Sequence, residues 1–298
     1  MWQACWVVER LRVLYPQRSY RIKGIRTQGD KIMDIALAKI GDKGLFTKEL
    51  EYAILCGEVD MAVHSMKDLP TELPEGLTLG AVCEREYPGD VLIAHGGKSL
   101  DDLPAGAVIG TSSLRRAAQI LNYRSDLKTV DLRGNLQTRL RKLDENKFDA
   151  TILAYAGVHR MELDLRIAQV IPFEICLPAV GQGAVGVEAA VGNDEILNLL
   201  TNIDHHDSRQ AITAERSFLR KLEGGCQVPI GAYAKIEGSC LCLEGTVVSL
   251  DGRDKVRSSV LGDMQEAEQI GARLADKLIS LGAGEILSKV RQEIRCDG

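Results

Sequence analysis

The chain has 298 residues, of which 45% are hydrophobic and 27% charged, and its formal net charge is −5. This composition is that of an ordinary globular protein, and it lacks the basic excess of a nucleic-acid or membrane-surface binder. No apolar run approaches the roughly 20 residues that span a bilayer, and no secretory signal is visible. The eight cysteines are scattered singly, as is typical of a reducing compartment. We expect a cytoplasmic protein, a monomer, with no nucleic-acid or membrane partner.

The first part of the chain alternates between helical and strand patterns. We expect helices over residues 2–15, 30–40 and 47–56, and strands over 20–27, 59–64 and 77–83. The strand that ends at His64 leads into a loop over 65–70, at the end of the strand where open α/β sheets bind ligands. Residues 84–90 are polar enough to cross to another domain.

A second α/β unit is predicted from Val91 onward. Strands over 107–110, 128–132 and 149–153 each lead into a helical pattern, which predicts a mostly parallel sheet. Residues from 177 onward look like a return crossing toward the first unit. After a helix over 208–222, three strands within 230–262 and helices over 265–281 and 284–291 predict a small α+β unit. The expected domains are therefore 1–84 together with 183–202, then 90–177, and then 207–298.

Arginines gather at two successive strand-to-helix junctions of the second unit. Arg115 and Arg116 follow the hydroxyl residues 111–113, and Arg133 precedes a helix that carries Arg139. Helix starts favour anions, and the guanidinium fork matches the two oxygens of a carboxylate. A solvated basic helix face is the ordinary alternative. Repetition at two helix starts in an acidic chain favours a polyanion pocket, and the low aromatic content of 4% gives base stacking little support.

Cys226 follows the helix predicted over 208–222, on a tight turn. Gly224 and Gly225 end that helix, because glycine takes the positive φ of a helix C-terminus at little cost, and Pro229 prevents the helix from resuming. An unpaired cysteine more often fills space than reacts. The turn alone therefore leaves a packing role and a functional role open.

Three other motifs are set aside. Residues 181–186 match the spacing of a dinucleotide fingerprint, but a β-like run follows them where a helix is required. His205-His206 has no carboxylate or cysteine at ligand spacing, and Cys240-Leu241-Cys242 has no second cysteine pair. We therefore expect neither an NAD site nor a metal site.

Several motifs, in order along nearly the whole chain, resemble those of the porphobilinogen deaminase family, also called hydroxymethylbilane synthase. These motifs are KGLFTKELE (43–51), AVHSMKD (62–68), GTSSLRR (110–116), LRGN (132–135), TRL (138–140), LPAVGQGA (177–184) and EGGCQVPIG (223–231). The resemblance implies an α/β fold of three domains. The first two are similar to the lobes of type II periplasmic-binding proteins, and the third is a small α+β domain.

The resemblance also implies a transferase of tetrapyrrole (heme) biosynthesis. Four molecules of porphobilinogen are joined head to tail, with loss of ammonia at each step, to give the linear hydroxymethylbilane. Cys226 matches the cysteine that holds a dipyrromethane cofactor through a thioether, and this cofactor primes the growing chain. Each pyrrole adds an acetate and a propionate, so the growing product is a polyanion that accounts for the arginines.

The resemblance assigns roles residue by residue. Asp68 matches the catalytic carboxylate, which stabilises the positive charge left on the substrate when its amino group departs and which transfers protons, with Lys67 beside it. The residues that match cofactor contacts are Cys226, Ser65, Lys67, Thr111, Ser113, Arg115, Arg116 and Arg133. The expected substrate contacts are Arg139, Arg133, Gln182 and Gln3. Lys43 and Phe46 match a segment that the family uses as a flexible cover.

One feature departs from the family pattern. Family members begin with a strand and an Arg-Gly-Ser-type turn before the helix that contains Trp2-Gln3-Ala4, whereas this chain starts at Met1. We expect the chain as written to have a weakened first domain and little activity, with a translation start upstream as the explanation. An inactive or truncated member that binds a polycarboxylate is the alternative function. Lys67-Asp68 and the cysteine turn argue against it, since a binding module needs neither.

Overall fold

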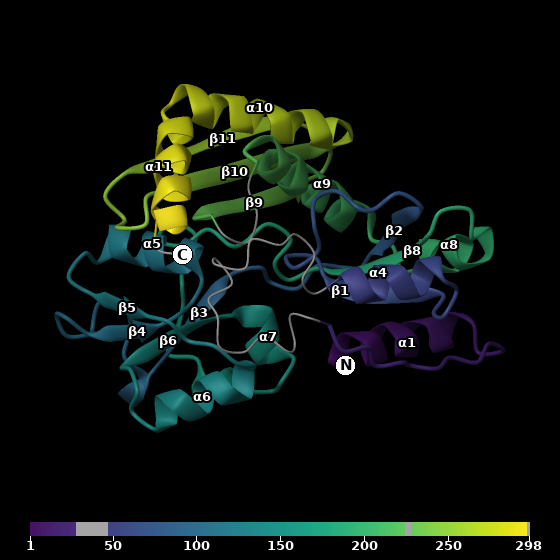
Figure 1. Cartoon of the computed structure of the whole chain (residues 1–298), viewed down its shortest axis with the longest axis horizontal. Helices are drawn as coiled ribbons and strands as arrows, with labels where there is room; N and C mark the ends of the chain where they lie inside the picture. The colour runs from purple at the N-terminus through teal and green to yellow at the C-terminus, as the bar shows by residue number, and fades with distance from the viewer. Residues whose placement is uncertain (28–46, 224–227, 297–298) are drawn as a thin grey trace.

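The computed structural model describes residues 1–27, 47–223 and 228–296, which form three sheets with their own helices (Figure 1). Two of these sheets have three strands and the other has five. In the view of Figure 1, the C-terminal unit lies above the other two units. None of the helices in the described part of the chain combines the length and the apolar character needed to cross a bilayer.

The first unit is built on an antiparallel sheet with the strand order β1-β8-β2. Its elements are α1 (Trp2–Leu14), α4 (Lys48–Leu55), β1 (Met61–Ser65), β2 (Leu77–Val82), β8 (Val185–Ala190) and α8 (Asp194–Thr201). Side chains of β8 alternate between the two faces, as the pleat requires. Val187 packs with Val7 and Leu11 of α1, whereas Ala190 packs with Ile54 of α4. The central strand of this unit therefore comes from a segment far along the chain.

The second unit is a five-stranded sheet with the order β5-β4-β6-β3-β7. Its elements are β3 (Asp90–Ala94), η1 (His95–Gly97), β4 (Val108–Gly110), α5 (Leu114–Tyr123), β5 (Lys128–Val130), α6 (Leu136–Asp144), β6 (Ala150–Ala154), α7 (Tyr155–His159), η2 (Asp164–Arg166) and β7 (Gln169–Val170). Strand β4 is parallel to β5 and β6, and β3 is antiparallel to β6 and β7. Because β4 and β5 are parallel neighbours, the starts of α5 and α6 lie at the same edge of the sheet.

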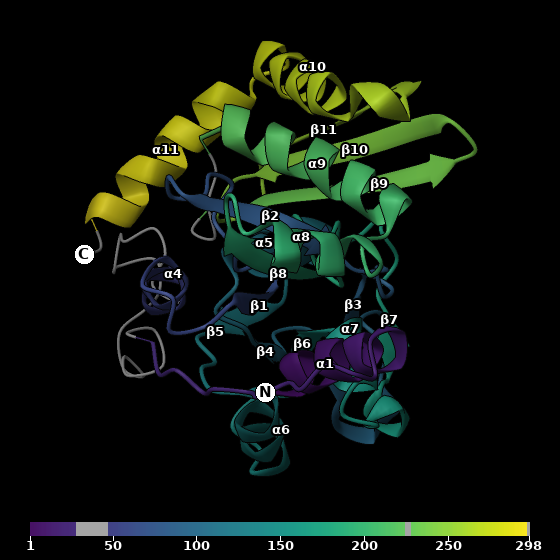
Figure 2. The ribbon, with the colours of Figure 1, turned by 90° about the vertical axis from the view of Figure 1, so that its right-hand side faces the viewer.

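The third unit is an antiparallel meander covered by helices. Its elements are α9 (His206–Lys221), β9 (Ile230–Glu237), β10 (Cys240–Val248), β11 (Lys255–Asp263), η3 (Met264–Glu266), α10 (Ala267–Ser280) and α11 (Ala283–Cys296). Figure 2 shows α9 and α10 lying together over the sheet. Phe218 of α9 is fully buried, and a Cβ at Gly245 of β10 would lie 2.6 Å from its ring. The glycine thus lets the helix approach the sheet closely.

Two segments connect the first and second units: an outgoing crossing between β2 and β3, and a return crossing between β7 and β8. The buried carboxylate of Glu215 joins both crossings to α9. Glu215 accepts from Arg85 Nη1 at 2.6 Å and Nη2 at 3.1 Å, from Gly181 N at 2.8 Å, and from Ala234 N at 2.8 Å. Arg85 lies in the outgoing crossing, Gly181 in the return crossing, and Ala234 in β9. A buried charge is tolerated only when it is well paired, and Glu215 satisfies this condition with four donors. The third unit is therefore the frame on which both crossings are fixed.

One prediction about secondary structure is wrong. Residues 20–27 form no strand within the described part of the chain; Tyr20 donates to Leu11 O at 3.3 Å, and Lys23 pairs with Glu58 at 2.7 Å. A strand needs a neighbour that supplies ladder hydrogen bonds, which a residue pattern cannot guarantee. The mostly parallel sheet predicted for the second unit is confirmed: β4 is parallel to β5 and β6, β7 runs in the same direction, and β3 runs against both of its neighbours.

The other elements agree with the predictions to within a few residues at their ends. The helix predicted over 30–40 lies outside the described residues. The α/β class with a small α+β unit at the C-terminus is confirmed. The domain limits, at 1–84 with 183–202, at 90–177 and at 207–298, stay a prediction.

Candidate active site

The turn that carries Lys67 and Asp68 follows directly from β1 and is seated on β8. Met66 N donates to Ala184 O at 3.0 Å, and Asp68 N donates to Ser65 O at 2.9 Å. The Met66 side chain is buried against two glycines. A Cβ at Gly181 would lie 2.9 Å from Met66 Cβ, and one at Gly186 would lie 2.3 Å from its sulfur. Asp68 is left exposed and Lys67 half-buried.

At the start of α5, two arginines share one buried carboxylate. Asp90 Oδ2 accepts from Arg115 Nη1 at 2.7 Å. Its Oδ1 accepts from Arg116 Nε at 3.1 Å and Nη2 at 2.7 Å. Burial by itself would raise the pKa of Asp90, but the attraction of the two guanidinium groups outweighs it and holds this pKa well below its usual range. Asp90 is therefore ionised, and the three groups together carry a net charge of about +1.

Gln182 belongs to the same buried cluster. It is only 1% exposed, and its amide nitrogen donates to Pro88 O at 2.7 Å and to Asp90 Oδ1 at 2.9 Å. Its amide oxygen accepts from Arg116 Nη2 at 3.4 Å. Its polar atoms join the return crossing to β3 and α5. That Gln182 also contacts substrate stays a prediction. Pattern reading placed it correctly in the crossing but could not show where its side chain points.

Arg115 has one buried donor left over. Its Nη1 also donates to Leu177 O at 2.7 Å and to Cys176 Sγ at 3.3 Å, but its buried Nε has no acceptor among the described residues. An orphaned buried donor is costly, and a carboxylate would satisfy it. Of its three guanidinium nitrogens, Nη1 is the one that donates to described residues, so the rest of the group fits a carboxylate-bearing cofactor.

The start of α6 differs from that of α5. Arg139 Nε donates to Gly134 O at 2.9 Å, and Lys142 Nζ donates to Arg133 O at 3.4 Å. Gly134 has a φ of 114°, and a Cβ there would lie 2.7 Å from Thr138, so this turn requires glycine. Within residues 1–27, 47–223 and 228–296, no ion pair includes Arg133, Arg139 or Lys142. Their positive charge is therefore not neutralised by a neighbouring carboxylate of the described chain.

Electrostatic coupling shows that predicted residues of the first and second units lie close together. The pKa of Arg139 is lowered to about 10, chiefly by desolvation and also by Arg116 and Arg133, while Asp68 opposes the shift. Desolvation also lowers the pKa of Lys67, with Asp68 raising it and Arg116 lowering it. Asp68 of the first unit therefore faces cations of the second, as a carboxylate beside a polyanion site would.

The hydroxyl residues at the start of α5 are used as acceptors. Ser113 caps the helix by accepting from Arg116 N at 3.4 Å, and Thr111 Oγ1 accepts from Ser113 N at 3.2 Å. Since a hydroxyl both donates and accepts, each keeps a proton that it can donate to an anion. Gln3 is half-buried in the first turn of α1, and Ser65 is half-buried at the end of β1. Cys226, Lys43 and Phe46 lie outside the described residues.

Sequence reasoning missed two residues of this region. Asp90 opens a strand whose other residues are all apolar, and this contrast was the signal that could have marked it as a buried partner. Arg160 follows α7; its Nη2 donates to Gly183 O at 2.9 Å and its guanidinium lies 5.3 Å from the ring of Trp2. Burial lowers the pKa of Arg160. Arg160 thus contacts all three of α7, the return crossing and α1.

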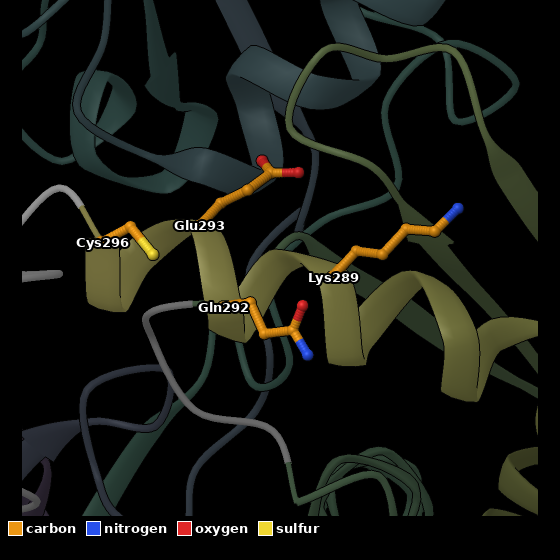
Figure 3. Close-up of a pocket in the computed structure, with 4 residues that line it drawn as sticks. All are labelled: Lys289, Gln292, Glu293 and Cys296. Carbon is orange, nitrogen blue, oxygen red and sulfur yellow. The ribbon is translucent and has the colours of Figure 1, made fainter.

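A surface pocket of about 340 Å³ lies along α11 (Figure 3). Its described lining comes from one stretch of that helix: Lys289, Gln292, Glu293 and Cys296. None of the predicted site residues is among these four. The pocket therefore does not bear on the site at the edge of the second sheet. Among the residues described, no group of three or more metal-ligating side chains is assembled either.

Comparison with known proteins accounts for these motifs. The family model described as "Porphobilinogen deaminase, dipyromethane cofactor binding domain" matches residues 1–198, and "Porphobilinogen deaminase, C-terminal domain" matches residues 209–280. The chain belongs to the porphobilinogen deaminase family. A porphobilinogen deaminase from Pelotomaculum thermopropionicum is 63% identical over 295 residues, covering 99% of this chain and 95% of that protein. One from Desulforudis audaxviator is 58% identical over 289 residues, covering 97% and 94%.

Solved structures add little to this family assignment. A putative methionine-binding lipoprotein from Bacillus subtilis is 13% identical, with a TM-score of 0.42 over 67% of this chain and 85% of that one. A likeness of that size carries no argument about function. The porphobilinogen deaminase relatives do, and their names favour no inactive or merely binding member.

Proposed function

We propose that the chain is a hydroxymethylbilane synthase, a transferase that joins four molecules of porphobilinogen and releases ammonia at each addition. The observation that carries the proposal is the electrostatic interaction of Asp68, on the turn after β1, with Arg139 of the second unit, beside Lys67 and Arg116. A substrate with a cationic leaving group and two carboxylates needs this combination of one anion and several cations. The curated relatives of this chain are named as porphobilinogen deaminases.

We infer that Asp68 is the catalytic carboxylate. It is exposed, and it lies on the turn that buried Met66 anchors. As the amino group of porphobilinogen leaves, positive charge develops on the substrate, and a fixed carboxylate nearby stabilises that charge. The same oxygens can give a proton to the departing amine and take one from the new linkage. Lys67, with its lowered pKa, orients the acidic side of the substrate beside Asp68.

The family's cofactor, dipyrromethane, supplies a covalently held pyrrole to which the first substrate is added. We propose that Cys226 carries it, and that Ser65, Lys67, Thr111, Ser113, Arg115, Arg116 and Arg133 contact it. The orphaned Nε of Arg115 and the unneutralised cations at the start of α6 fit a group with several carboxylates. We assign Arg139 and Arg133 to incoming substrate, with Gln3 at the edge of the site.

We also propose that the protein acts as a cytoplasmic monomer on this small-molecule substrate, without nucleic-acid or membrane partners. The three units would then serve as domains with the limits given above, the first carrying catalysis, the second the carboxylates and the third the cofactor. Size-exclusion chromatography with light scattering tests the monomer directly. A stable dimer at micromolar concentration would overturn that part.

The decisive experiment follows the covalent cofactor and the product together. The chain is expressed in a cell that makes tetrapyrroles, its intact mass is measured, and it is then supplied with porphobilinogen. We expect a mass increase corresponding to a dipyrromethane, release of one ammonia per porphobilinogen, and a linear tetrapyrrole product. Cys226→Ser is expected to remain soluble, to lack the adduct and to show no turnover. An unmodified chain that binds polycarboxylates without ammonia release would instead support a binding protein.

A further inference from the structure

A row of arginines on α9 fastens this helix to the first unit. Arg209, Arg216 and Arg220 are spaced by seven and four residues, so they lie on one face of the helix. Each donates to backbone carbonyl oxygens of the first unit. The row therefore joins the helix that precedes the cysteine turn to the unit that carries Asp68.

Arg209 and Arg216 each donate to two successive carbonyl oxygens, at different places, and Arg209 in addition pairs through Nε with Asp204 at 2.7 Å. Arg209 Nη2 donates to the oxygens of two successive residues of β2, Leu79 at 3.2 Å and Gly80 at 3.0 Å. Arg216 donates to the oxygens of the two residues that follow Asp68, from Nη1 to Leu69 at 3.1 Å and from Nη2 to Pro70 at 2.6 Å. One contact fixes a strand that its own sheet already holds. The other fixes the turn that carries the catalytic carboxylate.

The turn depends on α9 for its shape. After β1 ends at Ser65, the residues around Asp68 belong to no helix or strand. Met66 and Leu69, on either side of Lys67-Asp68, are buried in one apolar cluster with Ile212 of α9. Ile212 is one helical turn before Arg216, so both side chains face the same part of the first unit. The apolar contact fixes the buried side chains of Met66 and Leu69, and the guanidinium of Arg216 fixes the backbone that leaves the turn.

The guanidinium of Arg216 is committed to these carbonyl groups. The residue is 8% exposed, and no ion pair among the described residues includes it. Its pKa is lowered to about 10, chiefly by desolvation and also by Arg220, while Glu188 opposes the shift. A buried cation without a carboxylate partner is costly, and its hydrogen bonds to two carbonyl oxygens offset that cost. Planar geometry matters here, because one fork reaches two successive oxygens.

We propose that Arg216 is a positioning residue of the deaminase reaction. By holding the carbonyl oxygens of Leu69 and Pro70, it keeps Asp68 in one place relative to α9. That helix ends at Lys221, five residues before Cys226 in the sequence. Arg216 thus sets the catalytic carboxylate in register with the segment that leads to the attachment residue. The inference rests on the proposed role of Asp68.

Arg216→Lys tests the geometry while it keeps the positive charge. A lysine is a point donor and reaches one oxygen where the fork reaches two. We expect kcat to fall by about 10- to 100-fold, since a displacement of order 1 Å at a catalytic group costs that much, with KM within about twofold. Arg209→Lys is the matched control on the same helix, and its kcat is expected to stay within about twofold of the parent. Both variants are assayed as holoenzymes whose adduct is verified by intact mass.

A double-mutant cycle separates positioning from general destabilisation. If Arg216 acts through Asp68, Arg216→Lys costs nothing further in an Asp68→Asn background. Losses that multiply, or equal losses in Arg209→Lys and Arg216→Lys, would overturn the inference and leave the role of Asp68 intact. Near-normal turnover in Asp68→Asn alone would instead overturn the catalytic assignment, and this inference with it.

Ile212→Val repeats the test with a milder change, in case Arg216→Lys does not fold. It removes one methyl group from the contact with Met66 and Leu69 and leaves the arginine in place. We expect a several-fold fall in kcat that disappears in the Asp68→Asn background. An unchanged kcat, or a fall that persists in that background, would count against the proposal.

Discussion

The two strand-to-helix junctions of the second sheet are alike in sequence and opposite in structure. The start of α5 has Arg115 and Arg116, which share buried Asp90 at 2.7 Å each. The start of α6 has Arg133 and Arg139, which form no ion pair with any described residue. Both junctions lie at the same sheet edge, because α5 and α6 follow parallel neighbours β4 and β5. The same motif therefore supports structure at one junction and leaves charge available at the other.

The contrast between the starts of α5 and α6 shows that an arginine-rich helix start is not by itself an anion site. At α5 the guanidinium groups join β3, α5 and the return crossing, and buried Arg115 Nε has no acceptor among the described residues. At α6 the arginine and lysine donate to carbonyl oxygens of their own turn, which leaves their charge uncompensated. We infer that α5 contributes mainly to stability and α6 mainly to carboxylate binding.

Asp90→Asn should have the largest effect, a loss of folding stability caused by disruption of the ion pairs at the start of α5. It leaves two buried arginines without their anion, and removal of one partner from a buried ion pair costs about 3–5 kcal/mol. Chemical denaturation of the adduct-bearing protein measures the loss, with Asp131→Asn, an exposed aspartate near α6, as the control. A change below about 1 kcal/mol would show that the α5 network is not a stability element.

Asp68→Asn should leave the fold at both helix starts unchanged and lower the rate of the reaction. The side chain is nearly isosteric, but its charge and its capacity to transfer protons are lost. We expect kcat to fall by about 10²- to 10³-fold, as for removal of one well-placed electrostatic contributor. The adduct should largely remain, as measured by intact mass. Turnover within a few-fold of the parent would contradict the catalytic role.

Arg139→Gln should weaken the α6 junction as a binding site without loss of stability. One charged hydrogen bond is worth about 1.5–3 kcal/mol, which corresponds to a rise in KM for porphobilinogen of roughly 10- to 100-fold. The melting temperature should change little, because the one hydrogen bond that this guanidinium makes to a described residue is to Gly134 O in its own turn. The exposed Arg141→Gln on the same helix is the control. A stability loss as large as that of Asp90→Asn would erase the contrast between the two junctions.

The pH dependence of stability should sharpen the contrast further. The pKa of Asp90 lies below its unfolded value of 3.8, so the ion pair stabilises the fold above that pH and loses its effect as pH falls. The advantage of the parent over Asp90→Asn should therefore shrink by up to about 1.4 kcal/mol per pH unit below 3.8. Urea titrations at several pH values between neutrality and acid measure this. A constant difference would mean that Asp90 is not the titrating group.

The periodic patterns predicted most helices and strands, because local spacing of apolar residues decides which face of an element is buried. The pattern over 20–27 failed, since a strand also needs a pairing neighbour. The site residues that the ordered motifs assign stay a prediction, and among them Asp68 and Arg116 act electrostatically on Lys67 and Arg139 in the structure. Motifs could not show which cations are neutralised, because Asp90 pairs across the fold with residues 25 and 26 positions later.

Spacing and turn chemistry within short segments were enough to predict the class of fold, the turn after β1 and the two arginine-bearing helix starts. The folded structure was needed to show that the Gln182 side chain donates to Pro88 O and to Asp90 of β3, and so joins the return crossing to the second sheet. It alone showed that Glu215 fixes both crossings and that Arg216 holds the turn of Asp68 from another unit. Hydrogen bonds and ion pairs between distant segments depend on which surfaces meet, and no local pattern specifies that.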